Sequence, residues 1–110
     1  MILAVDIGNT NIVLGAIEGE QILFLERMAT DRSATEMHYL VRIRSVRQFR
    51  NIRAQELEGA IICSVVPMVT MNVRPAVEQL TLKRAVVVGP GIKTGLRISI
   101  DNPGALGADR

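Results

Sequence analysis

The chain has 110 residues, of which 48% are hydrophobic and 22% are charged. This composition suits one globular domain with a core of its own, and it excludes a disordered chain. The net charge of +2 does not require a polyanionic partner. No apolar run is long enough to span a membrane, and Met1 leads directly into a predicted strand, so we expect neither a membrane segment nor a signal peptide.

Two apolar runs, residues 2–5 and 12–17, flank a short polar turn near the start of the chain. Neither run has a polar break, which is typical of strands that are buried on both faces. The dipeptide Gly8-Asn9 between them is typical of a hairpin, because both residues tolerate a positive φ better than most. We therefore expect two antiparallel strands.

The turn itself carries groups that suit a nucleotide phosphate. Asn9, Thr10 and Asn11 offer hydrogen-bond donors, and Gly8 lets a ligand approach the backbone. Asp6, at the end of the first strand, is an oxygen ligand of the kind that Mg²⁺ accepts directly or through water. The alternative is an ordinary hairpin whose polar side chains satisfy local backbone groups, and these residues alone leave both interpretations open.

A third strand and a long helix are expected next. A turn at 18–20 precedes the apolar run 21–28, which completes an antiparallel meander. Residues 33–36 match a capping box, with Ser33 as the N-cap and Glu36 as its partner. The sequence therefore predicts a helix from about residue 34 to about residue 51.

This predicted helix has apolar residues on two sides. One side is expected to pack on the sheet, and it consists of Met37, Val41, Phe49 and Ile52. Leu40 and Ile43 lie on the other side, as either a subunit contact or scattered surface residues. Five arginines crowd the same segment: Arg42, Arg44, Arg47, Arg50 and Arg53. Because only three aromatics are available to stack on bases, we expect a solvated helix face and no nucleic-acid partner.

The chain up to residue 88 continues as strand, helix and strand. Strands are expected at 59–66 and 85–88. Between them Asn72 is the favoured helix cap, because Pro75 would then occupy the first turn, and Thr70 is the alternative. The single cysteine, Cys63, lies in an apolar run, so we expect a buried, inert thiol and a reducing cytoplasm. This order of elements predicts a mixed sheet with helices on its faces.

The last 22 residues are rich in turns. Glycine and proline cluster at 89–95 and 101–104, on either side of a predicted short strand. Asp109 and Arg110 follow, and they would suit a hydroxyl-bearing anionic substrate, with the acid as base and the guanidinium as clamp. Taken by itself, the pair is more typical of an exposed ion pair, because such surface pairs are common.

Five motifs, read together, resemble the type III pantothenate kinases, which belong with the sugar kinases, Hsp70 and actin. The matching segments are DIGNTNIVLG at 6–15, TDR at 30–32, SVVP at 64–67, VVGPGIKTGL at 87–96 and DNPGALGADR at 101–110. They cover essentially the whole chain in the right order. The resemblance implies an α/β fold of the ribonuclease H-like (actin-like ATPase) type, with a three-stranded antiparallel meander and then α-β-α-β.

The resemblance also implies a function. The family phosphorylates pantothenate to 4'-phosphopantothenate with ATP, the first step of coenzyme A biosynthesis. The segment that binds ATP phosphates falls on Asp6, Ile7, Gly8, Asn9, Thr10, Asn11, Ile12 and Val13. The pantothenate-binding positions fall on Ile100, Gly107, Ala108, Asp109 and Arg110, with Asp109 as the proton acceptor. Mg²⁺ linked to Asp6 through water, a K⁺ or NH₄⁺ site beyond this chain and a cytoplasmic homodimer are implied as well.

Two features depart from the family pattern. Many members have a tyrosine where this chain has Ile100, and its absence weakens one contact to pantothenate. The family also continues past residue 110 into a second domain with another phosphate segment and the adenine pocket. We therefore interpret residues 1–110 as the first ribonuclease H-like domain and expect it to be inactive alone.

Three alternatives remain open at this point. The first is a nucleotide-binding or regulatory protein without catalysis, which the presence of Asp109 and Arg110 disfavours. The second is a kinase for another small hydroxy acid, which Ile100 keeps open. The third is a basic interaction module that uses the arginine-rich helix.

Overall fold

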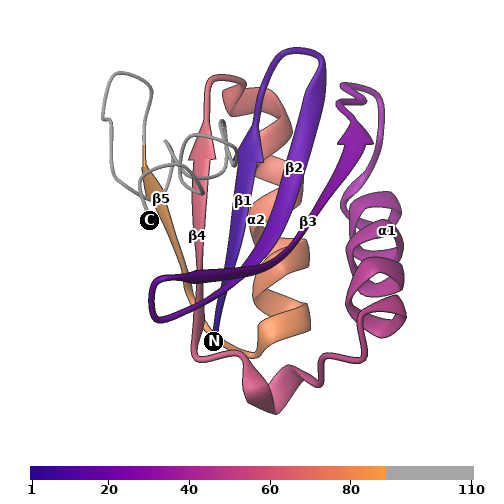
Figure 1. The fold of residues 1–110 in the computed structure, drawn as a ribbon. Coiled ribbons are helices and arrows are strands. Elements are labelled where there is room, and N and C mark those ends of the chain that lie inside the picture. Colours follow the sequence, from indigo (N-terminus) through magenta and orange to yellow (C-terminus); the bar gives the residue numbers. More distant parts are fainter. Residues whose placement is uncertain (89–110) are drawn as a thin grey trace.

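A computed structural model describes residues 1–88, which form a five-stranded mixed sheet with two α-helices (Figure 1). The elements in chain order are β1 (Ile2–Ile7), β2 (Asn11–Glu18), β3 (Gln21–Ala29), α1 (Glu36–Phe49), the 3₁₀ helix η1 (Ala54–Glu56), β4 (Gly59–Ser64), α2 (Pro67–Thr81) and β5 (Ala85–Val88). The expectations for Ile100, for residues 107–110 and for the loops at 89–104 lie outside the described residues. The predicted order of elements is confirmed.

The sheet has the strand order β3-β2-β1-β4-β5. β1 pairs antiparallel with β2, and β2 pairs antiparallel with β3, because each of these connections is a tight turn. β4 pairs parallel with β1, and β5 pairs parallel with β4. The chain passes through α1 before β4 and through α2 before β5, so it can return to the other end of the sheet before each of these strands begins. The predicted meander and the mixed sheet are both present.

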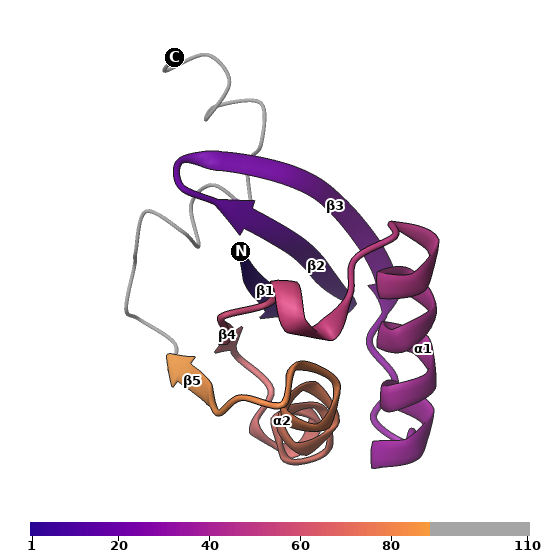
Figure 2. The ribbon, with the colours of Figure 1, turned by 90° about the horizontal axis from the view of Figure 1, so that it is seen from below.

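Both described helices lie on the same face of the sheet (Figure 2). Because successive strand residues point to opposite faces, Leu3, Val5 and Ile7 of β1 enter the core with the helices. Ala4 belongs to a smaller apolar cluster with Val13, which lies outside the helix-packed core. Asp6 is two residues after Ala4 in the same strand, so its side chain lies on the same face of the sheet, away from the helices.

The first helix begins two residues later than predicted. Its N-cap is Thr35, whose Oγ1 accepts from the N–H of His38 at 3.3 Å, while the N–H of Thr35 donates to Nδ1 of His38. Ser33 as N-cap was therefore wrong. Its N–H and hydroxyl both donate to Oδ1 of Asp31, at 2.9 and 2.7 Å, and these bonds to a charged acceptor hold Ser33 in the loop before the helix.

The predicted apolar faces of α1 are reversed. Tyr39 and Ile43 are buried, and Leu40 and Val46 pack against the core beside them. The residues expected on the sheet are exposed, at 62% for Met37, 42% for Val41 and 78% for Phe49; Ile52 is buried but lies beyond the helix. Tyr39 decides the orientation, since a large ring gains most from burial when its hydroxyl finds a partner. Leu40 and Ile43 are therefore core residues, not a subunit contact.

The second helix begins six residues earlier than predicted, with Val66 in place of Asn72 as its N-cap. Pro67 occupies its first turn, where a missing N–H costs no hydrogen bond, and Pro75 lies inside the helix. Asn72 is also inside, and its Nδ2 donates to the carbonyl of Ala34 at 3.2 Å. Thr70 likewise lies inside the helix and donates to the carbonyl of Val66. Neither predicted cap is a cap, because the proline directly after β4 starts the helix.

Candidate functional site

The predicted phosphate turn is the β1–β2 turn, residues 8–10. The N–H of Gly8 donates to the carbonyl of Asn11 at 2.9 Å. A positive φ at Gly8 or Asn9 was predicted and is wrong: among the described glycines only Gly19 has one. Gly8 is instead favoured by close approach, since a Cβ there would lie 3.1 Å from the Asn11 carbonyl oxygen and would require that oxygen to shift.

The β1–β2 turn lies at the sheet edge where β4 also ends (Figure 1). Parallel strands bring their carboxyl ends to one edge, and the N–H of Val65 donates to the carbonyl of Ile7 at 3.1 Å. Ser64 ends β4, and its hydroxyl accepts from the N–H of Val66 at 2.9 Å. The first turn of α2 follows at once, so a helix N-terminus opens at the same edge as the turn.

The side chains of the predicted phosphate segment divide into two groups. Asn9, Thr10 and Asn11 are exposed at the turn. Ile7, Ile12 and Val13 are buried, at 0%, 0% and 7% exposure, so only their main chain can meet a ligand. The turn is thus polar and exposed, and the strand residues on either side of it are buried and apolar.

Asp6 is the acid of this edge, and its side chain is buried, with 6% exposure. It pairs in register with Val13 of β2 and Cys63 of β4, both of which are buried as well. Within residues 1–88 no three acidic, histidine or cysteine side chains group around a cation. A single carboxylate fits Mg²⁺, because this ion keeps several waters and takes its other ligands from substrate phosphates.

A second segment, residues 30–32, contacts the turn from the end of β3. The hydroxyl of Thr30 donates to the carbonyl of Gly8 at 2.7 Å, and its N–H donates to the carbonyl of Thr10 at 2.9 Å. Arg32 Nη2 donates to Oδ1 of Asn9 at 3.0 Å. The sequence predicted no role for this segment, although the motif TDR was the signal that could have indicated it.

The middle residue of that segment has its own supports. The Tyr39 hydroxyl donates to the carbonyl of Asp31 at 2.6 Å and accepts from its N–H at 3.0 Å. The bonds from Ser33 to the carboxylate, together with Arg42 at 3.6 Å, hold the pKa of Asp31 below its ordinary value. Asp31 is therefore an ionised structural group that connects this segment to Ser33 and to Arg42 and Tyr39 of α1.

The comparison with known proteins decides the family. Residues 2–110 match the family model of the type III pantothenate kinases. The chain belongs to this family. A type III pantothenate kinase of Exiguobacterium sp. AT1b is 42% identical over 110 residues, which is 100% of this chain and 43% of that protein. The chain thus spans less than half the length of the curated relatives it matches.

Solved structures agree on the fold of this chain. The ROK hexokinase from Thermus thermophilus matches with a TM-score of 0.60 at 14% identity, over 80% of this chain and 34% of that one. RuvC of the same organism matches with a TM-score of 0.55 at 17% identity, over 96% of this chain and 78% of that one. These similarities confirm the ribonuclease H-like fold.

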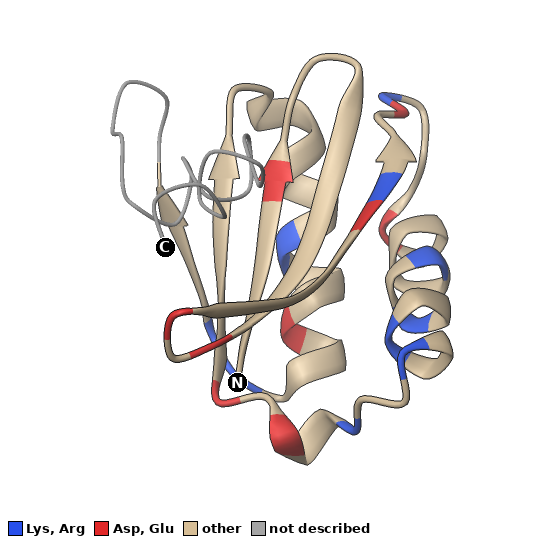
Figure 3. Ribbon diagram, in the orientation of Figure 1, with Lys and Arg blue, Asp and Glu red and all other residues tan. Residues whose placement is uncertain are grey.

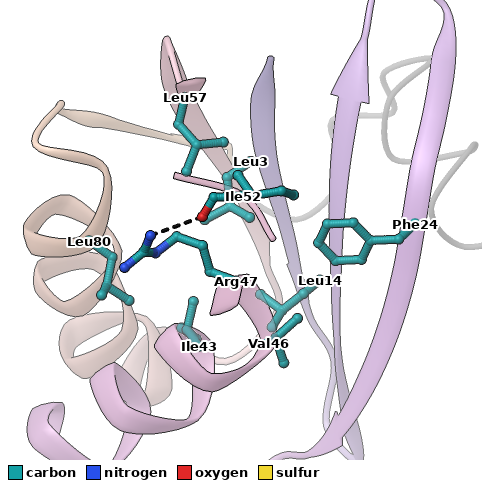
Figure 4. Close-up of a pocket in the computed structure, with 9 residues that line it drawn as sticks. All are labelled: Leu3, Leu14, Phe24, Ile43, Val46, Arg47, Ile52, Leu57 and Leu80. Atoms are coloured by element: carbon teal, nitrogen blue, oxygen red, sulfur yellow. Dashed lines mark hydrogen bonds between the residues drawn. The ribbon is translucent and has the colours of Figure 1, made fainter. Parts of the chain in front are cut away.

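The arginines are only partly a solvated face, although basic residues recur along α1 (Figure 3). Arg50 pairs with Glu26 and lies over the ring of Phe24. Arg47 points into a cavity of about 10 Å³ among apolar side chains and donates to the carbonyl of Ile52 at 2.9 Å (Figure 4). The expectation of a solvated side chain was wrong for Arg47, because its carbonyl partner lies within the core. This cavity has room for about one water and is no ligand site.

Cys63 is buried, at 1% exposure, as expected. Neither of the two described α-helices is long and apolar enough to cross a membrane.

Proposed function

We propose that this chain is the N-terminal part of a kinase that transfers the γ-phosphoryl group of ATP to the primary hydroxyl of pantothenate, the first step of coenzyme A biosynthesis. The observation that carries the proposal is the family match over residues 2–110, which includes the β1–β2 turn. In the transfer, a bond forms between the hydroxyl oxygen and the γ-phosphorus, and the bond from that phosphorus to the β–γ bridging oxygen breaks. ADP leaves, and the hydroxyl proton goes to a base.

In this proposal the β1–β2 turn binds the phosphates of ATP. Asn9, Thr10 and Asn11 supply the exposed donors, and the backbone of residues 6–13 supplies the rest. Asp6 holds Mg²⁺ through water, and the ion, when bound, neutralises charge on the phosphates. The buried Ile7, Ile12 and Val13 keep the turn at a fixed place on the sheet, which is what phosphoryl transfer asks of a protein.

The acceptor side of the proposal uses residues outside the described part of the chain. Asp109 takes the hydroxyl proton, and Arg110 pairs with the carboxylate of pantothenate. Gly107 and Ala108 line the same site, and Ile100 stands where many relatives have a tyrosine. This replacement weakens one contact to pantothenate without touching the transfer chemistry.

The remaining parts of the proposal concern the whole protein. A second domain supplies the other phosphate segment, the adenine pocket and a K⁺ or NH₄⁺ site, so residues 1–110 alone do not turn over. In this proposal the full-length protein is a cytoplasmic homodimer.

The test uses the full-length protein that contains this chain, with ATP and pantothenate as substrates. Formation of ADP and phosphopantothenate in equal amounts is expected, and Asp109→Asn is expected to lower kcat by about a hundredfold or more. The control is Glu56→Gln, which removes an exposed carboxylate in η1 far along the chain from the turn. Glu56→Gln should keep wild-type rates.

Two results would overturn the proposal in different ways. ATP binding without turnover on any hydroxy acid would indicate a nucleotide-binding or regulatory member. Turnover of another hydroxy acid in preference to pantothenate would indicate a related kinase, and Ile100→Tyr would then be the variant to examine.

A further inference from the structure

We propose that Thr30 and Arg32 are positioning residues that hold the β1–β2 turn in its phosphate-binding shape. This inference rests on the proposed function and extends it to a segment that lies 22 residues along the chain from the turn. Both residues act through the turn, because each donates a hydrogen bond to an acceptor of residues 8–10.

Thr30 controls the direction of two peptide groups. Its hydroxyl and its N–H bind the carbonyls of Gly8 and Thr10, which lie on either side of Asn9. The peptide unit is planar, and the described part of the chain contains no cis bond, so a carbonyl and the following N–H point in opposite directions. Fixing these two carbonyls toward Thr30 therefore turns the N–H groups of Asn9 and Asn11 away from it. N–H groups are the donors that an anion needs.

Arg32 controls a side chain in the same way. Its guanidinium has only donors, so it can bind only the oxygen of the Asn9 amide, and the contact is 3.0 Å from Nη2 to Oδ1. An Asn9 side chain held by its oxygen presents its NH₂ group on the other side. Without Arg32 the amide is free to rotate, and its oxygen can then face the phosphate and repel it.

The segment 30–32 is itself fixed to α1. The hydroxyl of Tyr39, whose side chain has 0% exposure, bonds to both the carbonyl and the N–H of Asp31. Arg42 of α1 pairs with the carboxylate of the same residue at 3.6 Å. Residues 30–32 therefore connect the turn to α1, so the hydrogen bonds from Thr30 and Arg32 come from a segment that is itself held in place.

The experiment measures steady-state kinetics of the full-length protein with ATP and pantothenate varied separately. Thr30→Val and Arg32→Met are expected to raise the KM for ATP roughly tenfold, because each removes one strong hydrogen bond to the turn. The KM for pantothenate should stay close to wild type, and the melting temperature should fall by only a few degrees. Thr30→Ser, which restores the hydroxyl, should recover the wild-type KM for ATP. Arg44→Met removes an exposed charge from α1 and is the matched control.

A double substitution separates positioning from direct contact. If Arg32 acts through Asn9, Arg32→Met should add no further change in a protein that already carries Asn9→Ala. Multiplying effects would overturn the positioning role of Arg32 in favour of a direct phosphate contact. An unchanged KM for ATP in both single variants of an active enzyme would overturn the whole inference. A wild-type protein that fails to use ATP would instead overturn the proposed function, so the two failures are distinguishable.

Discussion

The two hairpin turns of the meander contain glycines that are needed for different reasons. Gly19, in the β2–β3 turn, has a φ of +61°, and a Cβ there would meet nothing within 4 Å. Gly8, in the β1–β2 turn, has no positive φ but faces a carbonyl oxygen at 3.1 Å from its would-be Cβ. The β2–β3 turn uses a left-handed backbone conformation, whereas the β1–β2 turn has its own bond from Gly8 to Asn11 and receives three more hydrogen bonds from residues 30 and 32. A turn that must present a fixed set of donors needs the second kind of support.

Alanine at each glycine is the strongest test of this difference. Gly8→Ala pushes the Asn11 carbonyl by a few tenths of an ångström, so we expect kcat/KM for ATP to fall by about tenfold or more. Gly19→Ala keeps a residue with a Cβ in the left-handed region and should cost about 1 kcal/mol of unfolding free energy while ATP kinetics stay unchanged. Kinetics and denaturant unfolding of the full-length protein measure both. An equal fall of kcat/KM for ATP in the two variants would contradict the different roles of Gly8 and Gly19.

Removal of the Tyr39 hydroxyl tests whether the supports of the β1–β2 turn extend to α1. Tyr39→Phe leaves the main-chain groups of Asp31 without their partner, which we expect to cost about 1–2 kcal/mol of unfolding free energy and to raise the KM for ATP a few-fold. Ser45→Ala is the matched control, because it also removes one hydroxyl from α1, on the exposed side. An unchanged KM for ATP in Tyr39→Phe would show that the contacts of α1 do not affect ATP binding at the turn.

The smallest expected effect is a difference in pH response between the two regions. The pKa of Asp31 is lowered by its bonds to Ser33, so this contribution to stability is present above about pH 4 and lost as the pH falls through the folded value. The pKa of the Met1 amino group is raised, chiefly by its bond to Glu18 beside the β2–β3 turn. That contribution is present below about pH 8 and lost as the pH rises through the folded value.

An NMR titration of the two groups checks these directions. Asp31 is expected to titrate below an exposed aspartate, and the Met1 amine above an exposed amine. Both groups are near the surface, so high salt should reduce both shifts. An Asp31 pKa above that of an exposed aspartate, or a Met1 pKa below that of an exposed amine, would contradict the corresponding stability contribution.

Much of the fold could be predicted because its signals are local. The apolar runs at 2–5, 12–17 and 85–88 form strands, and the short turns between the first three strands dictate their antiparallel pairing. The errors occurred at helix starts, where a residue with the sequence of a cap has another partner. Ser33 bonds to Asp31, and Asn72 lies inside α2 and bonds to the carbonyl of Ala34, which precedes α1. Propensity does not rank such partners, since their distance is known only in the folded chain.

The sequence by itself determined the family, the order of the elements and the polar turn after Asp6, because these depend on residue types and on their spacing along the chain. The tertiary structure alone decided which face of α1 is buried, and it placed Thr30 and Arg32 on the turn. Contacts between residues more than 20 positions apart leave no periodic pattern in a single sequence. They form only when the meander and the helix have packed, and for that reason the shape of the β1–β2 turn depends on the fold as a whole.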